Sequence, residues 1–167
     1  MIYLTPGAEQ NKALKTALEK YHHRLVEHEV TICMLLVFDE IDQNGEAVGA
    51  ALKLHGVSCF AVTRILSLKL RAHGLADAEI LVDGELWKDM PGKSRIAMMD
   101  HELTHLDLVF KDNSLVRDSL GRPKLAMRMH DYHHGWFSEV VDRHGAASIE
   151  SLQANRFVKE SGQLYLL

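Results

Sequence analysis

The sequence predicts a single α+β domain over residues 1–167, in which a small mixed β-sheet packs against one central helix and a C-terminal helix. Runs at 30–38, 58–66 and 78–87 are rich in β-branched and apolar residues, which favours strands. Longer segments with apolar residues at three- and four-residue steps predict the helices. With 47% hydrophobic and 25% charged residues, the chain has the composition of one globular domain with its own core.

Residues 1–29 are expected to form an N-terminal unit with one amphipathic helix at 8–26. Leu14, Leu18 and Leu25 repeat along one stripe of this helix, whereas Glu, Lys and Gln occupy the rest. Histidines gather at its C-terminal end, where a cation complements the helix dipole. We therefore interpret these histidines as surface residues: His22, His23 and His28.

The core unit, residues 30–148, begins with the three predicted strands. The third strand, at 78–87, contains Gly84, and a glycine inside a strand often marks a bulge or the close approach of another backbone. We expect this strand to have a free edge where an extended peptide could add as a further strand. The intervening segments are predicted to be a loop at 39–49, a short helix at 50–54 and a polar connection at 69–76.

The central helix carries an H-E-x-x-H motif, which begins at His101 and ends at His105. Residues four apart lie on the same face of a helix, so both imidazoles can aim at one point. Glu102 lies about 100° around the helix from His101, where its carboxylate can reach a water without being a ligand. Because Pro91 precedes the pattern and its apolar periodicity ends at Phe110, the motif falls inside one helix.

This spacing predicts one Zn²⁺ per chain, bound by His101 and His105, with Glu102 as the catalytic base. Zinc lowers the pKa of a bound water to about 7, and a nearby carboxylate can then take a proton during attack on a carbonyl. The alternative is that these histidines are core or surface residues without a metal.

The third ligand is expected from a second histidine cluster, since a catalytic zinc takes three protein ligands and keeps one position open. Leu108 stands where the longer H-E-x-x-H-x-x-G-x-x-H motif requires glycine, which excludes that subclass. The cluster follows a predicted hairpin at 114–129 and precedes a predicted helix at 135–144, both within the core unit. A last helix at 148–160 and an apolar tail at 163–167 are expected to form the C-terminal unit, residues 149–167. The spacing leaves five candidates open: His130, Asp131, His133, His134 and Glu139.

The overall charge is −4 and no block of like charge occurs, which argues against a dedicated nucleic-acid or membrane surface. The first thirty residues lack an apolar signal-peptide core, and the longest apolar run, 32–38, is too short to span a bilayer. We therefore expect a cytoplasmic protein. Cys33 and Cys59 lie in apolar runs, which favours buried thiols over a disulfide.

From residue 30 to 148 the chain resembles the putative phage metallopeptidases, a family of phages, prophages and mobile elements. The resemblance is carried by these segments: Leu75-Ala76-Asp77-Ala78-Glu79-Ile80, Asp83-Gly84-Glu85-Leu86-Trp87, Asp100 to Leu106, His130-Asp131, Gly135-Trp136-Phe137 and Arg143-His144-Gly145. The family pattern keeps the H-D pair and varies the two positions before G-W-F, which favours His130 as the third ligand and leaves His134 as the alternative. More distantly, the layout is similar to SprT-like and other minimal zincins.

The resemblance implies a zincin-like fold, a protein or peptide substrate and a location in the cytoplasm of a bacterial host cell. Asp100, Asp131 and Tyr132 are candidates for supporting the zinc ligands or the oxyanion that forms on attack. Two other functions stay open: a zinc-containing binding module that does not cleave its partner, and a zinc hydrolase of a non-peptide amide. A structural zinc would more naturally have a fourth protein ligand.

Overall fold

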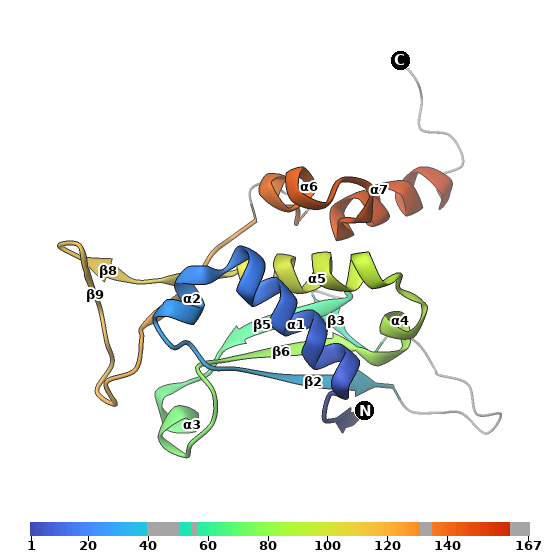
Figure 1. The fold of residues 1–167 in the computed structure, drawn as a ribbon. Coiled ribbons are helices and arrows are strands. Elements are labelled where there is room, and N and C mark those ends of the chain that lie inside the picture. The colour runs from blue at the N-terminus through green and yellow to red at the C-terminus, as the bar shows by residue number, and fades with distance from the viewer. Residues whose placement is uncertain (40–50, 55–56, 131–134, 161–167) are drawn as a thin grey trace.

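The computed structural model describes residues 1–39, 51–54, 57–130 and 135–160, and it confirms the α+β class (Figure 1). A four-stranded mixed sheet carries two helices, α1 (Ala8–Tyr21) and α5 (Gly92–Thr104), on one face. Helices α6 (Ser138–His144) and α7 (Ile149–Glu160) lie over α5 on the side away from the sheet, and a 3₁₀ turn at Gly145–Ala147 joins them. The central helix is therefore enclosed between layers.

The sheet has the strand order β1-β2-β6-β5. Its two central strands, β2 (Ile32–Phe38) and β6 (Ala78–Asp83), run parallel, whereas β1 (Ile2–Leu4) and β5 (Ala61–Ile65) pair antiparallel to them at the two edges. The three predicted strands are confirmed with shorter bounds, and β1 adds a fourth. The expected free edge on the third predicted strand is wrong, because β6 is paired on both sides.

The third predicted strand ends early, at Asp83, where the chain turns into α4 (Gly84–Asp89). The Asp83 carboxylate accepts hydrogen bonds from the backbone N–H groups of Glu85 and Leu86, which is how an N-cap residue begins a helix. Gly84 is thus a helix residue, which corrects its assignment to a strand. It does mark a close approach, because a Cβ at this position would collide with the Phe38 ring.

The predicted helix at 8–26 is broken at His22 into α1 and a short α2 (His23–Glu27). His22 has φ −122° and ψ 45°, outside the helical region, so its side chain turns inward toward α5. The interpretation of His22 as a surface residue is therefore wrong. Two smaller predictions also fail: the helix at 50–54 is replaced by β3 (Lys53–Leu54) paired with β4 (Val57–Ser58), and the connection at 69–76 contains α3 (Leu68–Ala72).

After α5 the chain forms short paired strands that lead to the second histidine cluster. The predicted hairpin is present around Gly121, where Asp118 N–H donates to the Arg122 carbonyl and Lys124 N–H donates to the Val116 carbonyl. The strands here are β7 (Leu106–Leu108), β8 (Phe110–Lys111), β9 (Ser114–Leu115) and β10 (Leu125–Met127), with β10 paired to β7 and β9 to β8. Asp131, Tyr132, His133, His134, the loop at 40–49 and the tail at 163–167 lie outside the described residues.

Candidate metal centre

Three imidazoles meet beside the C-terminal end of α5. His101 lies in the last turn of α5, His105 is its C-cap, and His130 follows β10. One nitrogen from each ring lies within 4.8 Å of the other two, and the Nε2 atoms of His101 and His130 are 3.3 Å apart. Two nitrogens bound to a tetrahedral zinc at about 2.0–2.1 Å are about 3.3–3.4 Å apart. The His101–His130 pair therefore already has the spacing of two zinc ligands.

Hydrogen bonds on the far side of two rings orient their nitrogens. Nδ1 of His101 lies 2.7 Å from Oε1 of Glu150, and Nδ1 of His105 lies 2.9 Å from the backbone oxygen of Arg128. Both oxygens accept hydrogen bonds, so each Nδ1 carries the proton and each Nε2 presents a lone pair in the neutral ring. The protein thereby fixes the tautomer that a metal requires.

The protonation of the three rings is shaped by burial and by their neighbours. For His130, burial comes first and the nearby His105 and His101 add to it, which lowers the pKa to about 4. Burial likewise lowers the pKa of His105. Burial opposes charge on His101 too, but the hydrogen bond to Glu150 and the charge of Glu102 outweigh it and raise the pKa of this ring. His105 and His130 are thus held in the neutral form that binds a metal.

Glu102 is buried beside this cluster and faces β5. The Thr63 hydroxyl, at the centre of β5, donates a hydrogen bond to Oε2 of Glu102 at 2.7 Å. Burial raises the pKa of the Glu102 carboxyl, while His101 and the Thr63 hydrogen bond oppose that rise. A carboxyl with a raised pKa in a site of this kind is suited to taking up and releasing a proton near neutral pH.

The segment after the cluster closes the site from the side of α6. The Phe137 ring is fully buried and packs at centroid distances of 4.9, 5.0 and 4.9 Å from His101, His105 and His130 respectively. Gly135 has φ +78°, a conformation that side chains rarely adopt, and a Cβ there would lie 3.4 Å from the His130 ring. The G-W-F segment therefore packs directly against the candidate ligands.

The carboxylate of Asp100, the residue before His101, lies on a different side of α5 from the three imidazoles. Its carboxylate is fully buried and lies 2.7 Å from Nε2 of His22, 2.8 Å from Nη1 of Arg143 and 2.7 Å from Nε2 of His144. Burial alone would raise the pKa of Asp100, but hydrogen bonds from His22 and His144 and the charge of Arg143 hold it below the usual value. Its carboxylate thus joins α5 to the N-terminal helices and to α6.

A family model described as "Putative phage metallopeptidase" matches residues 6–161 of the 167. The chain belongs to this family. No protein of curated function and no solved structure matches the chain. The match extends beyond residues 30–148, where the resemblance was recognised, and takes in both α1 and α7.

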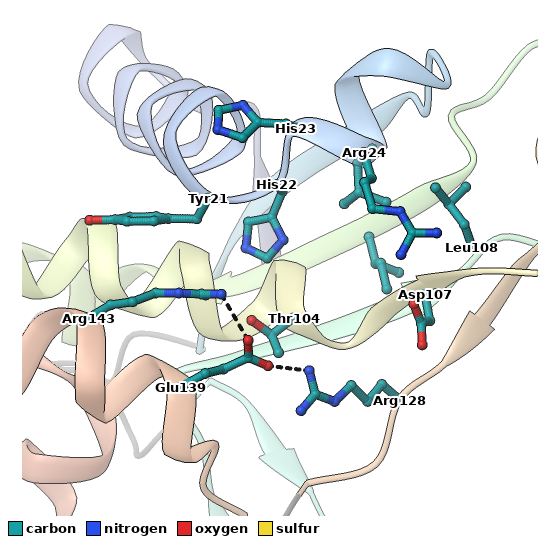
Figure 2. Close-up of a pocket in the computed structure, with 12 residues that line it drawn as sticks. Tyr21, His22, His23, Arg24, Thr104, Asp107, Leu108, Arg128, Glu139 and Arg143 are labelled. Carbon is teal, nitrogen blue, oxygen red and sulfur yellow. Dashed lines mark hydrogen bonds and ion pairs between the residues drawn. The ribbon is translucent and has the colours of Figure 1, made fainter.

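This family member also has a pocket of about 280 Å³ on the Asp100 side of α5, between α1, α2, β7 and α6 (Figure 2). Glu139 lies across it and pairs with both Arg128 and Arg143. None of the three clustered imidazoles lines the pocket, so it is separate from the candidate metal centre. Arg128 connects the two, because its backbone oxygen accepts the hydrogen bond from His105.

The structure brings together four residues predicted to act at one site: His101, Glu102, His105 and His130. Asp100 is adjacent in sequence but its carboxylate contacts other partners, and Glu139, one of the five candidate ligands, pairs with two arginines instead. Asp131, Tyr132 and His134 lie outside the described residues. Glu150 and Thr63 were not predicted, because neither lies near the motif along the chain and neither belongs to a recognisable spacing.

Among the described residues, no helix has both the length and the apolar character that crossing a membrane requires.

Proposed function

We propose that the chain is a zinc-dependent peptidase that binds one Zn²⁺ through His101, His105 and His130 and uses Glu102 as its catalytic base. One observation carries the proposal: three imidazoles present one nitrogen each within 4.8 Å of one another, one pair at the spacing of zinc ligands, beside a buried carboxylate. All three ligands are nitrogens, which suits zinc and not the oxygen-preferring magnesium or calcium. Membership of a metallopeptidase family supports the reaction class.

A bound zinc would supply an acidified water and polarise the substrate carbonyl. Glu102 takes a proton from the attacking water while the oxygen of that water bonds to the carbonyl carbon. It then delivers that proton to the amine nitrogen as the C–N bond breaks. The buried setting that raises the pKa of Glu102 makes the first of these transfers, proton uptake from water, more favourable, and the hydrogen bond from Thr63 holds the carboxylate in one orientation.

The neighbouring edge of the sheet supports a peptide as the substrate. Asp83 N–H donates to the Phe60 carbonyl and Leu66 N–H donates to the Asp77 carbonyl, which sets the alternation of the β5–β6 pair. Residues 61, 63 and 65 of β5 therefore direct their backbone groups away from β6. An extended peptide can pair with this edge, where the side chain of Thr63 contacts Glu102. A small non-peptide amide has no backbone to use such an edge.

Metal content and turnover test this proposal on the purified full chain. We expect about one zinc per chain by mass spectrometry. The zinc should be lost in His130→Ala and kept in His134→Ala. In Glu102→Gln we expect zinc to be retained and cleavage of a mixed peptide library to fall by about 10²–10⁴-fold. The matched control is Glu139→Gln, which removes another α-helical carboxylate whose ion pairs, in the described part of the chain, are with Arg128 and Arg143.

Full zinc in His130→Ala would contradict the ligand assignment. Zinc in the wild type without cleavage of any peptide would favour a zinc-containing binding module, and turnover confined to small amides would favour an amide hydrolase. The expected place of action is the cytoplasm of a bacterial cell that carries the phage or prophage.

A further inference from the structure

Glu150 reaches the candidate metal centre from the C-terminal helix. It is the second residue of α7 and is 1% exposed. Its Oε1 lies 2.7 Å from Nδ1 of His101 and accepts a second hydrogen bond, at 3.2 Å, from the backbone N–H of Phe137. Its Oε2 is buried without a hydrogen-bond partner among the described residues. Burying a carboxylate with one unpartnered oxygen costs folding free energy, so its presence here calls for a reason.

The contact with His101 gives that reason in terms of geometry. An ionised carboxylate can only accept, which holds the proton of His101 on Nδ1 and leaves Nε2 free on the side of His130. It also fixes the rotation of the ring, because the Phe137 N–H anchors the same oxygen. An imidazole held in this way is more basic toward a metal and does not need to reorient on binding.

We propose that Glu150 is the positioning residue for His101, and that through it the C-terminal helix α7 is part of the metal centre. This inference rests on the proposed zinc site and identifies what holds it in shape. A second hydrogen bond joins α7 to the segment that contains Phe137: Trp136 Nε1 donates to Oε1 of Gln153 at 2.9 Å. Docking of α7 and loading of the metal are therefore coupled.

Zinc affinity tests the coupling, measured by competition with a chromophoric chelator. Glu150→Ala should bind zinc about 10–100-fold more weakly than the wild type. Glu150→Gln keeps an acceptor oxygen but loses the charge, so its zinc affinity should lie between those of the wild type and Glu150→Ala. The matched control, Gln153→Ala, removes a hydrogen bond between the same helix and the same segment without touching His101, and should stay within about twofold of the wild type.

Two further measurements separate positioning from general support of the fold. The ¹⁵N spectrum of the metal-free wild type should show His101 protonated on Nδ1, and Glu150→Ala should shift the population toward protonation on Nε2. The metal-free melting temperature of Glu150→Gln should be no lower than that of Gln153→Ala. A purely structural role would lower the melting temperature and leave the tautomer unchanged.

The outcomes distinguish this inference from the proposed function. Wild-type zinc affinity in Glu150→Ala would overturn the positioning role and leave the peptidase proposal standing. Weaker binding in that variant, with no peptide cleaved by the wild type, would uphold the positioning role and overturn the peptidase. A wild type that binds no zinc would overturn both.

Discussion

Replacing Asp100 with Asn tests whether this residue supports the fold or the metal. Asp100 is 0% exposed, and its two oxygens receive His22 from the α1–α2 junction and the neighbouring Arg143 and His144 from α6. Asparagine keeps the shape, removes the charge and turns one acceptor into a donor. Among the described contacts, the carboxylate reaches none of the three clustered imidazoles.

The expected cost follows from the burial of the partners. Removing one member of a buried ion pair costs about 3–5 kcal/mol. The Arg143 side chain is 28% exposed, so water can solvate it in the variant, which places the loss in unfolding free energy near the lower bound, about 3 kcal/mol. For a chain of this size each kcal/mol lowers the melting temperature by about 2–4 °C, which gives a decrease of about 6–12 °C.

Urea unfolding at pH 7 measures this loss, with Glu139→Gln as the control. Glu139 is the other carboxylate on Arg143 but is 37% exposed, so its removal should cost less than about 1 kcal/mol. Because folding lowers the pKa of Asp100, its stabilisation is present above pH of about 4 and is lost as the pH falls through the folded-state pKa. Equal unfolding free energies for the two variants, or loss of zinc from Asp100→Asn, would refute the reasoning.

Two other substitutions test the site. Thr63→Val removes the hydrogen bond that opposes the raised pKa of Glu102, so the acidic limb of kcat/KM against pH should move to higher pH with the plateau retained; an unmoved limb would contradict the assigned base. Gly135→Ala should cost about 1–2 kcal/mol because alanine is strained at this positive φ, and a backbone shift that relieves the strain beside His130 should weaken zinc binding. In Gly92→Ala no atom lies within 4 Å of the added Cβ. The free energy of unfolding in urea should be unchanged or higher in this variant, and its zinc affinity by competition should be unchanged.

The parts of the fold that sequence analysis predicted are those with local signals. The apolar periodicity around the motif located α5, and the run at 30–38 located β2, because each pattern is contained within its own element. The strand at 78–87 was extended too far, since the apolar and aromatic residues after Asp83 resemble a strand as much as a helix. The Asp83 cap and the close approach of the Phe38 ring to Gly84 accompany the helix in the structure.

The parts that were missed depend on contacts between distant segments. Glu150 follows Ser148 in the first turn of a helix, where an acid ordinarily complements the helix dipole, so nothing local connects it to His101. Thr63 in a strand is equally ordinary, because threonine favours strands on its own account. His22 was assigned to the surface from its place at the end of an amphipathic pattern, and its partner lies 78 residues away.

These missed partners share one physical origin in the burial of α5. The helix is buried through its last turns, and the charged or ring side chains of Asp100, His101 and Glu102 there take partners from neighbouring elements. The successive faces take theirs from α6 and the α1–α2 junction, from α7 and from β5. The polar side chains of the motif helix thus have hydrogen-bond partners on elements near both ends of the chain. The family match, from residue 6 to 161, includes all of these elements. Truncating either end would therefore remove hydrogen-bond partners of α5 before it removed any candidate ligand.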